Sequence, residues 1–175
     1  MASPNPIDPL RKARVCRRTR IVREQYSPTC RISRFEPGSR AEEVHLLIEP
    51  LDDGCFDEQL EQVVAQYHDA LESLDLPRHS AVFRRCFLSD AANQLDVVMA
   101  SPLGLAVPES ESAAISCIEQ RPVCNRKLAL LAYHIRDAEP AAKSLKTIPD
   151  AGPYARTLVL ERPERTLMWS AQMEC

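Results

Sequence analysis

Apolar and polar residues follow two different periods along the chain, and the longest helical pattern covers residues 56–74. Apolar residues recur there at three- and four-residue steps, which places them on one stripe of a helix: Phe56, Leu60, Val63, Val64, Tyr67, Leu71 and Leu74. Asp57 and Glu58 lie in the first turn, where the helix dipole favours anions, and Pro77 prevents much extension beyond the stripe. We therefore predict an amphipathic helix that buries one face.

Short apolar runs predict strands at 41–51, 81–88, 113–120 and 127–135. The second strand changes directly into a helical pattern, because Ser89 or Asp90 can accept backbone N–H groups as a helix N-cap. A short helix follows, with one apolar stripe formed by Leu95, Val98 and Met99, and it ends before Pro102 and Gly104.

The remaining chain divides by composition. Residues 1–40 are predicted to form a basic N-terminal arm or strands, and 41–136 the main domain. Residues 137–153 are rich in Ala, Pro, Lys, Asp and Gly, which predicts a linker, and 154–175 predict a hairpin split by Pro163-Glu164-Arg165. With 45% hydrophobic residues, the chain can supply a sizeable core.

The strands at 113–120 and 127–135 carry apolar residues on both faces. Two helices can cover only one face of a sheet, and the sequence offers little to cover the other. Burial of that second face against further copies of the chain is the economical solution. We therefore predict self-association through the sheet.

Charge is distributed unevenly. Residues 1–40 contain ten Lys/Arg and three Asp/Glu, a balance of +7, whereas the rest of the chain carries a balance of −10. RKARVCRRTR (11–20) is the most basic stretch and indicates either a nucleic-acid-binding arm or a solvated basic strand that pairs with the acidic body. The second interpretation is favoured, because no aromatic residue lies between the arginines to stack on bases.

Composition also excludes several classes of function. The seven cysteines are scattered without a CxxC pair, and the four histidines have no ligand spacing, so we expect neither a metal site nor a disulfide framework. No apolar run approaches the roughly 18 residues of a membrane span, and the N-terminus lacks the apolar segment of a secretory signal. We expect a cytoplasmic protein without a cofactor or a membrane partner.

Three segments resemble the RidA/YjgF family, once described as endoribonuclease L-PSP: the helix at 56–74, VFRRCFLSDAANQ (82–94), and AAISCIEQRP followed by LALLAYHI. The resemblance covers about 41–136. It implies an α+β fold, a two-layer α/β arrangement in which two helices lie on one face of a mixed sheet. It also implies a homotrimer with a central barrel, and clefts between subunits that bind a small metabolite.

In active members of this family, an Arg before a Ser-Cys pair grips a substrate carboxylate, and a Glu on the last strand helps to position water for imine hydrolysis. Ser116 and Cys117 match the Ser-Cys pair, but Ile115 occupies the Arg position and the Glu position falls near Ala129. A guanidinium fork is what fixes a planar carboxylate. The resemblance therefore implies a metabolite-binding protein without the usual deaminase residues. Its candidate ligand-binding residues are Ser116, Cys117 and Arg121, the last at the end of the same strand.

The family includes fused tandem relatives, among them chorismatase-like hydrolases. The hairpin at 154–175 resembles the first strands of a second copy, or alternatively extends or covers the sheet of the first domain. Three functions follow as hypotheses: a metabolite-binding trimer, an imine or chorismatase-like hydrolase that uses other residues, and an RNA-binding or ribonuclease-type protein acting through the basic arm.

Overall fold

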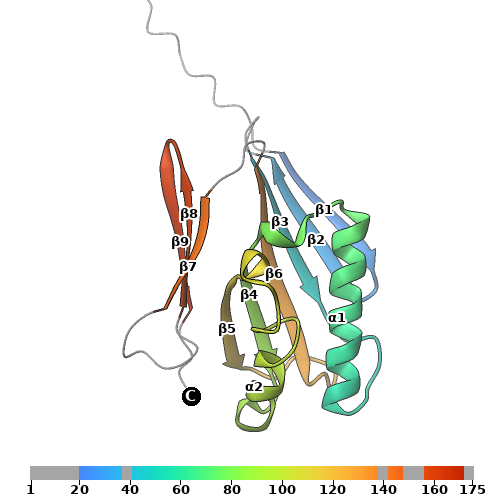
Figure 1. Ribbon diagram of the computed structural model, residues 1–175. Helices are drawn as coiled ribbons and strands as arrows, with labels where there is room; N and C mark the ends of the chain where they lie inside the picture. The colour runs from blue at the N-terminus through green and yellow to red at the C-terminus, as the bar shows by residue number, and fades with distance from the viewer. Residues whose placement is uncertain (1–19, 37–40, 138–141, 148–155, 172–175) are drawn as a thin grey trace, which may run out of the picture.

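The structure of the 175-residue chain is a computed structural model that describes residues 20–36, 41–137, 142–147 and 156–171. In this part of the chain, two helices and six strands form one layered unit, and a smaller sheet stands beside it (Figure 1). The large sheet has the order β1-β2-β3-β6-β4-β5, and the small sheet the order β7-β8-β9. The elements are β1 Arg20–Ser27, β2 Cys30–Glu36, β3 Ala41–Ile48, α1 Phe56–Ser73, β4 Ala81–Leu88, α2 Ala91–Met99, β5 Ala114–Glu119, β6 Leu128–Asp137, β7 Ala142–Thr147, β8 Arg156–Arg162 and β9 Arg165–Ala171.

The corner between β4 and α2 forms as predicted. β4 ends at Leu88, and the Asp90 carboxylate accepts the backbone N–H of Asn93 at 3.3 Å, which caps the first turn of α2. The chain then returns through β5, which runs parallel to β4, while β6 inserts antiparallel between β3 and β4. The abrupt corner thus places α2 against the same face of the sheet as α1 (Figure 1).

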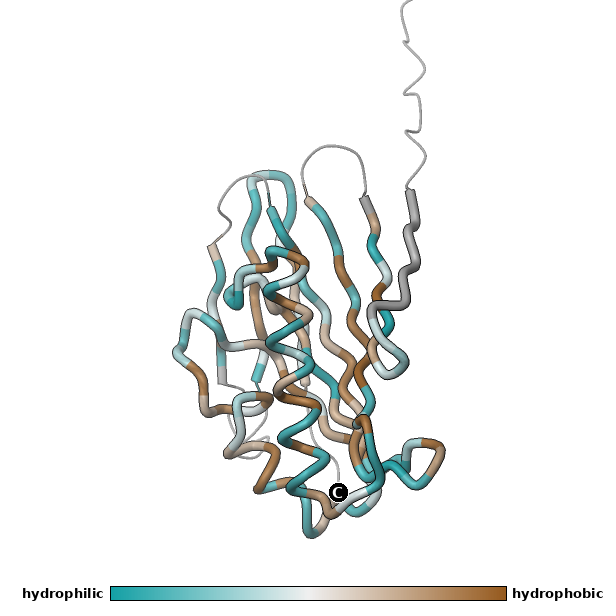
Figure 2. Tube along the Cα trace, turned by 90° about the vertical axis from the view of Figure 1, so that its right-hand side faces the viewer, coloured by the Kyte–Doolittle hydropathy of each residue, from teal (hydrophilic) through white to brown (hydrophobic). Residues whose placement is uncertain are grey.

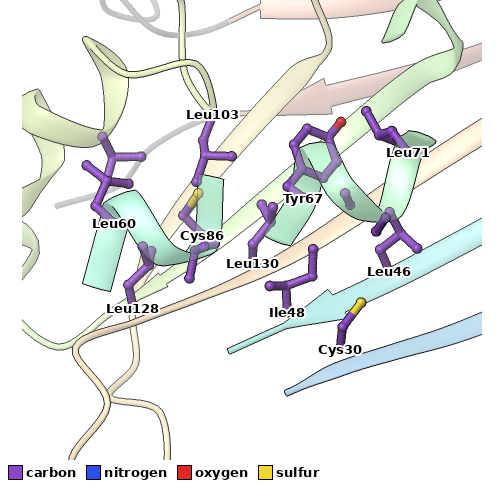
Figure 3. Packing of buried hydrophobic residues seen from close by; sticks show 14 of the residues in the cluster. Cys30, Leu46, Ile48, Leu60, Tyr67, Leu71, Cys86, Leu103, Leu128 and Leu130 are labelled. Atoms are coloured by element: carbon purple, nitrogen blue, oxygen red, sulfur yellow. The ribbon is translucent and has the colours of Figure 1, made fainter. Parts of the chain in front are cut away.

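The main core lies between the two helices and the large sheet. The α1 stripe supplies Leu60, Val63, Tyr67 and Leu71, which pack on side chains from β2, β3, β4, β5 and β6 (Figure 3). Hydrophobic and hydrophilic positions alternate along the turns of α1 in Figure 2, as the sequence pattern predicts. No helix in the described ranges has the length and apolarity that a bilayer crossing requires.

Part of the opposite face of the large sheet is covered by the chain's own small sheet. Val82, Ala114 and Ile135 form a second buried cluster with residues of the small sheet, namely Leu158, Leu160 and Ala171. Residues 142–147, expected to be part of a linker, instead pair with β8 as strand β7. This third strand widens the predicted hairpin into a three-stranded sheet.

A row of aromatic rings crosses this reverse face. Phe35 packs edge-on against His45 at 5.5 Å, His45 stacks on Tyr133 at 4.3 Å, and Tyr133 meets Trp169 of β9 edge-on at 5.8 Å. Such ring pairs stabilise beyond the area that they bury. The row connects the large sheet to β9, so the C-terminal strands cover this domain's own sheet, which is one of the two arrangements considered for the hairpin.

Candidate functional site

A cavity of about 660 Å³ lies where the small sheet meets one end of the large sheet. Its apolar wall comes from both sheets, with Val82 and Ile135 on one side and Leu145, Leu158 and Leu160 on the other. Two 3₁₀ turns, Arg78–Ser80 and Glu109–Glu111, contribute polar groups to the lining. The volume and the mixed lining are typical of small-molecule sites.

Lys143 projects from β7 into this junction and holds the two sheets together. Its ammonium group donates hydrogen bonds to the backbone carbonyls of Ala81 at 2.7 Å, His79 at 2.9 Å and Ser110 at 3.5 Å. No carboxylate among the described residues lies within ion-pair distance of it. Burial, and then the positive charge of Arg84, lower the pKa of Lys143 to about 8, against a smaller opposing effect of Glu111.

Ser80 lines the cavity and begins a buried chain of hydrogen bonds. Its Oγ lies 2.9 Å from Nδ1 of His134, and Nε2 of His134 lies 3.0 Å from the hydroxyl of Tyr67 on α1. A hydroxyl that is hydrogen-bonded to an imidazole, which is in turn held by a third group, is the arrangement of an activated nucleophile. Burial, with Arg84 and then Lys143, lowers the pKa of His134 to about 3, so the imidazole stays neutral and is a poor proton acceptor near pH 7. His134 therefore orients Ser80 rather than activating it.

Arg84 is the buried cation that adds to the effect of burial on the pKa of Lys143 and of His134. Its guanidinium donates to the carbonyls of Pro102 and Leu103, each at 3.3 Å, and of Glu111 at 3.4 Å, and its Cζ lies 5.5 Å from the centre of the Tyr67 ring. These carbonyls and the ring face satisfy much of its hydrogen-bonding capacity without neutralising its charge. The positive potential consequently extends to Lys143 and His134.

Two charged residues of the cavity lining, Arg136 and Asp137, form ion pairs between strands. Arg136 pairs with Glu42 of β3 and also donates to the carbonyls of Leu74 and Asp75. The last residue of β6, Asp137, pairs with Arg162 of β8, which joins the large and the small sheet at this end. With these charges paired, Lys143 is the cation in the described lining whose charge lacks a carboxylate partner within ion-pair distance.

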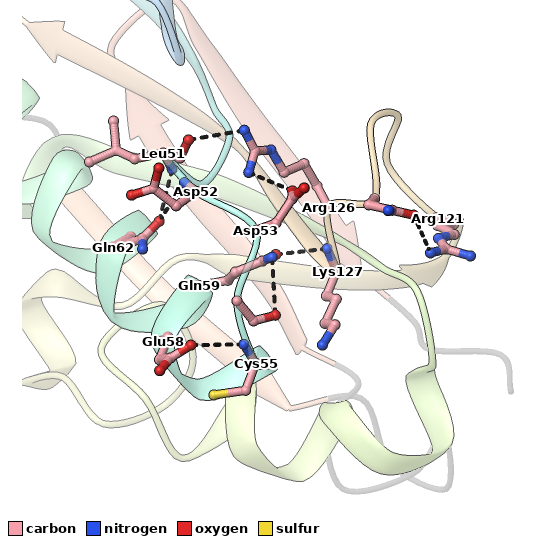
Figure 4. A network of polar contacts seen from close by, with 12 residues as sticks. Leu51, Asp52, Asp53, Cys55, Glu58, Gln59, Gln62, Arg121, Arg126 and Lys127 are labelled. Atoms are coloured by element: carbon pink, nitrogen blue, oxygen red, sulfur yellow. Dashed lines mark hydrogen bonds and ion pairs between the residues drawn. The ribbon is translucent and has the colours of Figure 1, made fainter.

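The three residues predicted from the sequence do not come together. Cys117 belongs to the core on the helix side. A hydrogen bond from the Cys86 thiol lowers the pKa of Cys117, and burial opposes this effect. Strand alternation directs Ser116 to the opposite face, the side of Ala114. Arg121 is exposed in the turn after β5 and donates to Asn125 at 3.0 Å (Figure 4). A ligand-binding role for these residues stays a prediction.

Arg121 also lies at the opposite end of β6 from the cavity. The turn that contains it is tied to the start of α1, since the Gln59 side chain accepts the N–H of Lys127 at 2.8 Å and Arg126 pairs with Asp53 at 2.9 Å (Figure 4). β6 begins beside this network at Leu128 and ends at Asp137 in the cavity lining. Ten residues of strand therefore separate the two places.

Sequence reasoning missed Lys143, Ser80 and His134 as members of one site. Lys143 lay in the segment interpreted as a linker, and the apolar residues of AKSLKT (142–147) are three positions apart, which is not the period of a strand. Ser80 and His134 are 54 positions apart and meet only through the pairing of β4 with β6. Within the described ranges, no three His, Cys, Asp or Glu side chains are grouped as a metal site would require.

Comparison with known proteins supports the fold and no more. No family model and no curated protein matches the chain. Among solved structures, a "putative translation initiation inhibitor" from Salmonella typhimurium is similar over 65% of this chain and 96% of its own, at 14% identity and a TM-score of 0.53. An uncharacterized protein from Pseudomonas aeruginosa is similar over 67% of this chain and 99% of its own, at 12% identity and a TM-score of 0.51. The chain therefore contains a nearly complete RidA/YjgF-like fold, with about a third of its length unmatched in each comparison.

Proposed function

We propose that the protein binds a small amphipathic metabolite in the cavity between its two sheets. The observation that carries this proposal is the combination of an apolar wall with the Lys143 ammonium group, which has no described carboxylate within ion-pair distance. A cation in a partly desolvated cavity attracts an anionic head group more strongly than it would in water. The leucines of β7 and β8 offer contact for a short aliphatic body.

The volume favours a ligand of modest size, and the polar groups at one side favour a single head group. Ser80 belongs to the lining and its hydroxyl is held by His134, so we expect it to hydrogen-bond to the same head group that Lys143 attracts. Preorganised polar groups of this kind reduce the entropy that binding costs. A short-chain carboxylate combines the required features.

Calorimetric titration with hexanoate and with its neutral counterpart hexan-1-ol tests this. We expect hexanoate to bind more tightly at pH 7, because only the carboxylate is attracted by Lys143. Leu145→Trp, at a half-buried residue of the lining, should weaken hexanoate binding about ten-fold or more by filling the cavity.

Met168→Trp is the matched control, since Met168 lies on the small sheet, is 64% exposed and is absent from the cavity lining. It should leave the affinity unchanged. Equal weakening by both substitutions, or no binding heat with either ligand, would contradict the proposed site.

Self-association into a homotrimer stays a prediction. Part of the face that motivated it is packed against β8 and β9, so the remaining apolar contribution comes from half-buried residues such as Leu47 and Leu131. Sedimentation velocity at micromolar concentration measures the state directly. A trimer mass would support assembly through the rest of this face, and a monomer mass would contradict the prediction of self-association.

Hydrolysis of imines by other residues and RNA binding through the basic arm also stay predictions. Residues 11–19, where the basic residues of that arm are densest, lie outside the described residues. An RNA interaction would be recognised by a steep loss of affinity with salt. The cavity supports the metabolite-binding proposal independently of both.

A further inference from the structure

We propose that Lys143 condenses reversibly with an aldehyde or ketone carrying a short apolar chain, so that the cavity holds the carbonyl compound as an imine. This inference rests on the proposed function, because it assigns a substrate class and a covalent step to the same cavity. It concerns a residue of β7, on the small sheet that covers part of the reverse face of the large sheet.

The first support is the position of the amine. Two short contacts to the carbonyls of Ala81 and His79 fix the Nζ atom, while the contact to the carbonyl of Ser110 at 3.5 Å is at the limit of a hydrogen bond. A neutral amine has two hydrogens, which satisfy the two short contacts. Its lone pair then replaces the third hydrogen, which had made only the weakest of the three contacts.

The second support is the balance of charge around the amine. From the turn at 109–111, Glu109 and Glu111 contribute negative charge, and Arg84 of β4 contributes positive charge. From β6, Arg136 and Asp137 are each paired, with Glu42 and Arg162 respectively. None of the described carboxylates is close enough to lock the ammonium form in an ion pair. With its pKa lowered to about 8, about a tenth of Lys143 is neutral at pH 7.

The chemistry requires no group beyond the substrate. The neutral amine adds to the carbonyl carbon, and proton transfer from nitrogen to oxygen gives a carbinolamine. Loss of water then forms the C=N bond, and hydrolysis reverses both steps. A lysine desolvated beside another cation is the arrangement that activates an amine as a nucleophile. The apolar wall formed by Leu145, Leu158 and Leu160 suits the chain of the carbonyl compound.

The sequence provides an internal control. The chain contains four lysines, at 12, 127, 143 and 146, so the products of amine modification are simple to map. Lys146 lies on the same strand, three residues from Lys143, but it is exposed and outside the cavity lining. A lysine whose pKa is about 8 contains roughly three hundred times more neutral amine at pH 7 than an unperturbed one. Its lower basicity offsets part of this advantage.

Reductive trapping tests the inference. The full-length protein is incubated at pH 7 with hexanal and sodium cyanoborohydride, and peptide mass spectrometry locates the hexyl groups. We expect Lys143 to be modified about ten-fold faster than Lys146, with a rate that rises toward pH 8. Lys143→Arg should abolish modification at this position, because arginine cannot form the imine. Lys146→Arg should leave trapping at Lys143 unchanged.

Equal rates at Lys143 and Lys146, or modification confined to the other amines, would overturn the inference. If hexanoate still binds in that case, the covalent step alone is wrong and the proposed function stands. If hexanoate does not bind and no trapping occurs, the proposed function is wrong as well. Persistent trapping at Lys143 in Leu145→Trp would show that the amine reacts outside the cavity, and would also overturn the inference.

Discussion

Acidification should destabilise the protein steeply, because the fold keeps His134 neutral. The pKa of His134 is lowered to about 3, whereas an unfolded histidine has a pKa of 6.5. Below pH 6.5 the unfolded chain binds a proton that the folded chain does not, so the free energy of unfolding falls by about 1.4 kcal/mol per pH unit. This loss should amount to roughly 2–3 kcal/mol between pH 7 and pH 4.5.

Urea unfolding at a series of pH values measures this slope. His134→Gln offers a neutral donor and acceptor at every pH, so the variant should be less stable than the wild type at pH 7 and should lose less stability on acidification. His79→Gln, at an exposed residue adjacent to the site's Ser80, should keep the wild-type slope. An unchanged slope in His134→Gln would contradict the assignment. Direct NMR titration of the His134 ring provides the same test without a variant, with no protonation expected above pH 4.

Leu158→Ala should cost about 2–5 kcal/mol of stability, because Leu158 is fully buried at the centre of the contact between the sheets. The substitution removes apolar contacts and leaves a cavity that neighbouring side chains fill only in part. The expected structural consequence is looser packing of the small sheet. Trp169 is the only tryptophan of the sequence and pairs with Leu158 across β8 and β9. Its fluorescence should therefore shift to longer wavelength.

Thermal and urea unfolding, followed both by circular dichroism and by Trp169 fluorescence, test whether the two sheets unfold together or separately. Coincident transitions at lower stability would show that the small sheet and the main core unfold together. Met168→Ala is the control on the adjacent strand, and because Met168 is 64% exposed its effect should stay within about 0.5 kcal/mol. Equal stability of Leu158→Ala and Met168→Ala would show that the small sheet does not pack on the large one as described.

The candidate site depends on the C-terminal strands, because its contacts connect the small sheet to the large one. Three carbonyls of the main domain accept hydrogen bonds from one residue of β7, and Asp137 pairs with Arg162 nearby. Both interactions cross from one sheet to the other. Loss of packing at Leu158 should therefore also weaken hexanoate binding, since the cavity wall belongs to both sheets.

The elements of the main domain were determined by local patterns in the sequence. The stripe along α1, the strand at β4 and the Asp90 corner follow from period and capping, which depend on residues close together in the chain. The apolar character of both faces near β5 and β6 was also correctly recognised. What local pattern does not specify is which surface covers an apolar face, because a partner subunit and a distant part of the same chain bury it equally well.

Tertiary structure decided that the chain's own C-terminal strands cover the face near β4, β5 and β6. It also created the cavity, because Ser80, His134 and Lys143 are brought together by strand pairing and by packing between sheets. The depressed pKa values of His134 and Lys143 arise from burial and from the charge of Arg84, neither of which a sequence pattern contains. The sequence by itself thus determined the layers of the domain, whereas long-range packing determined the chemistry of its candidate site.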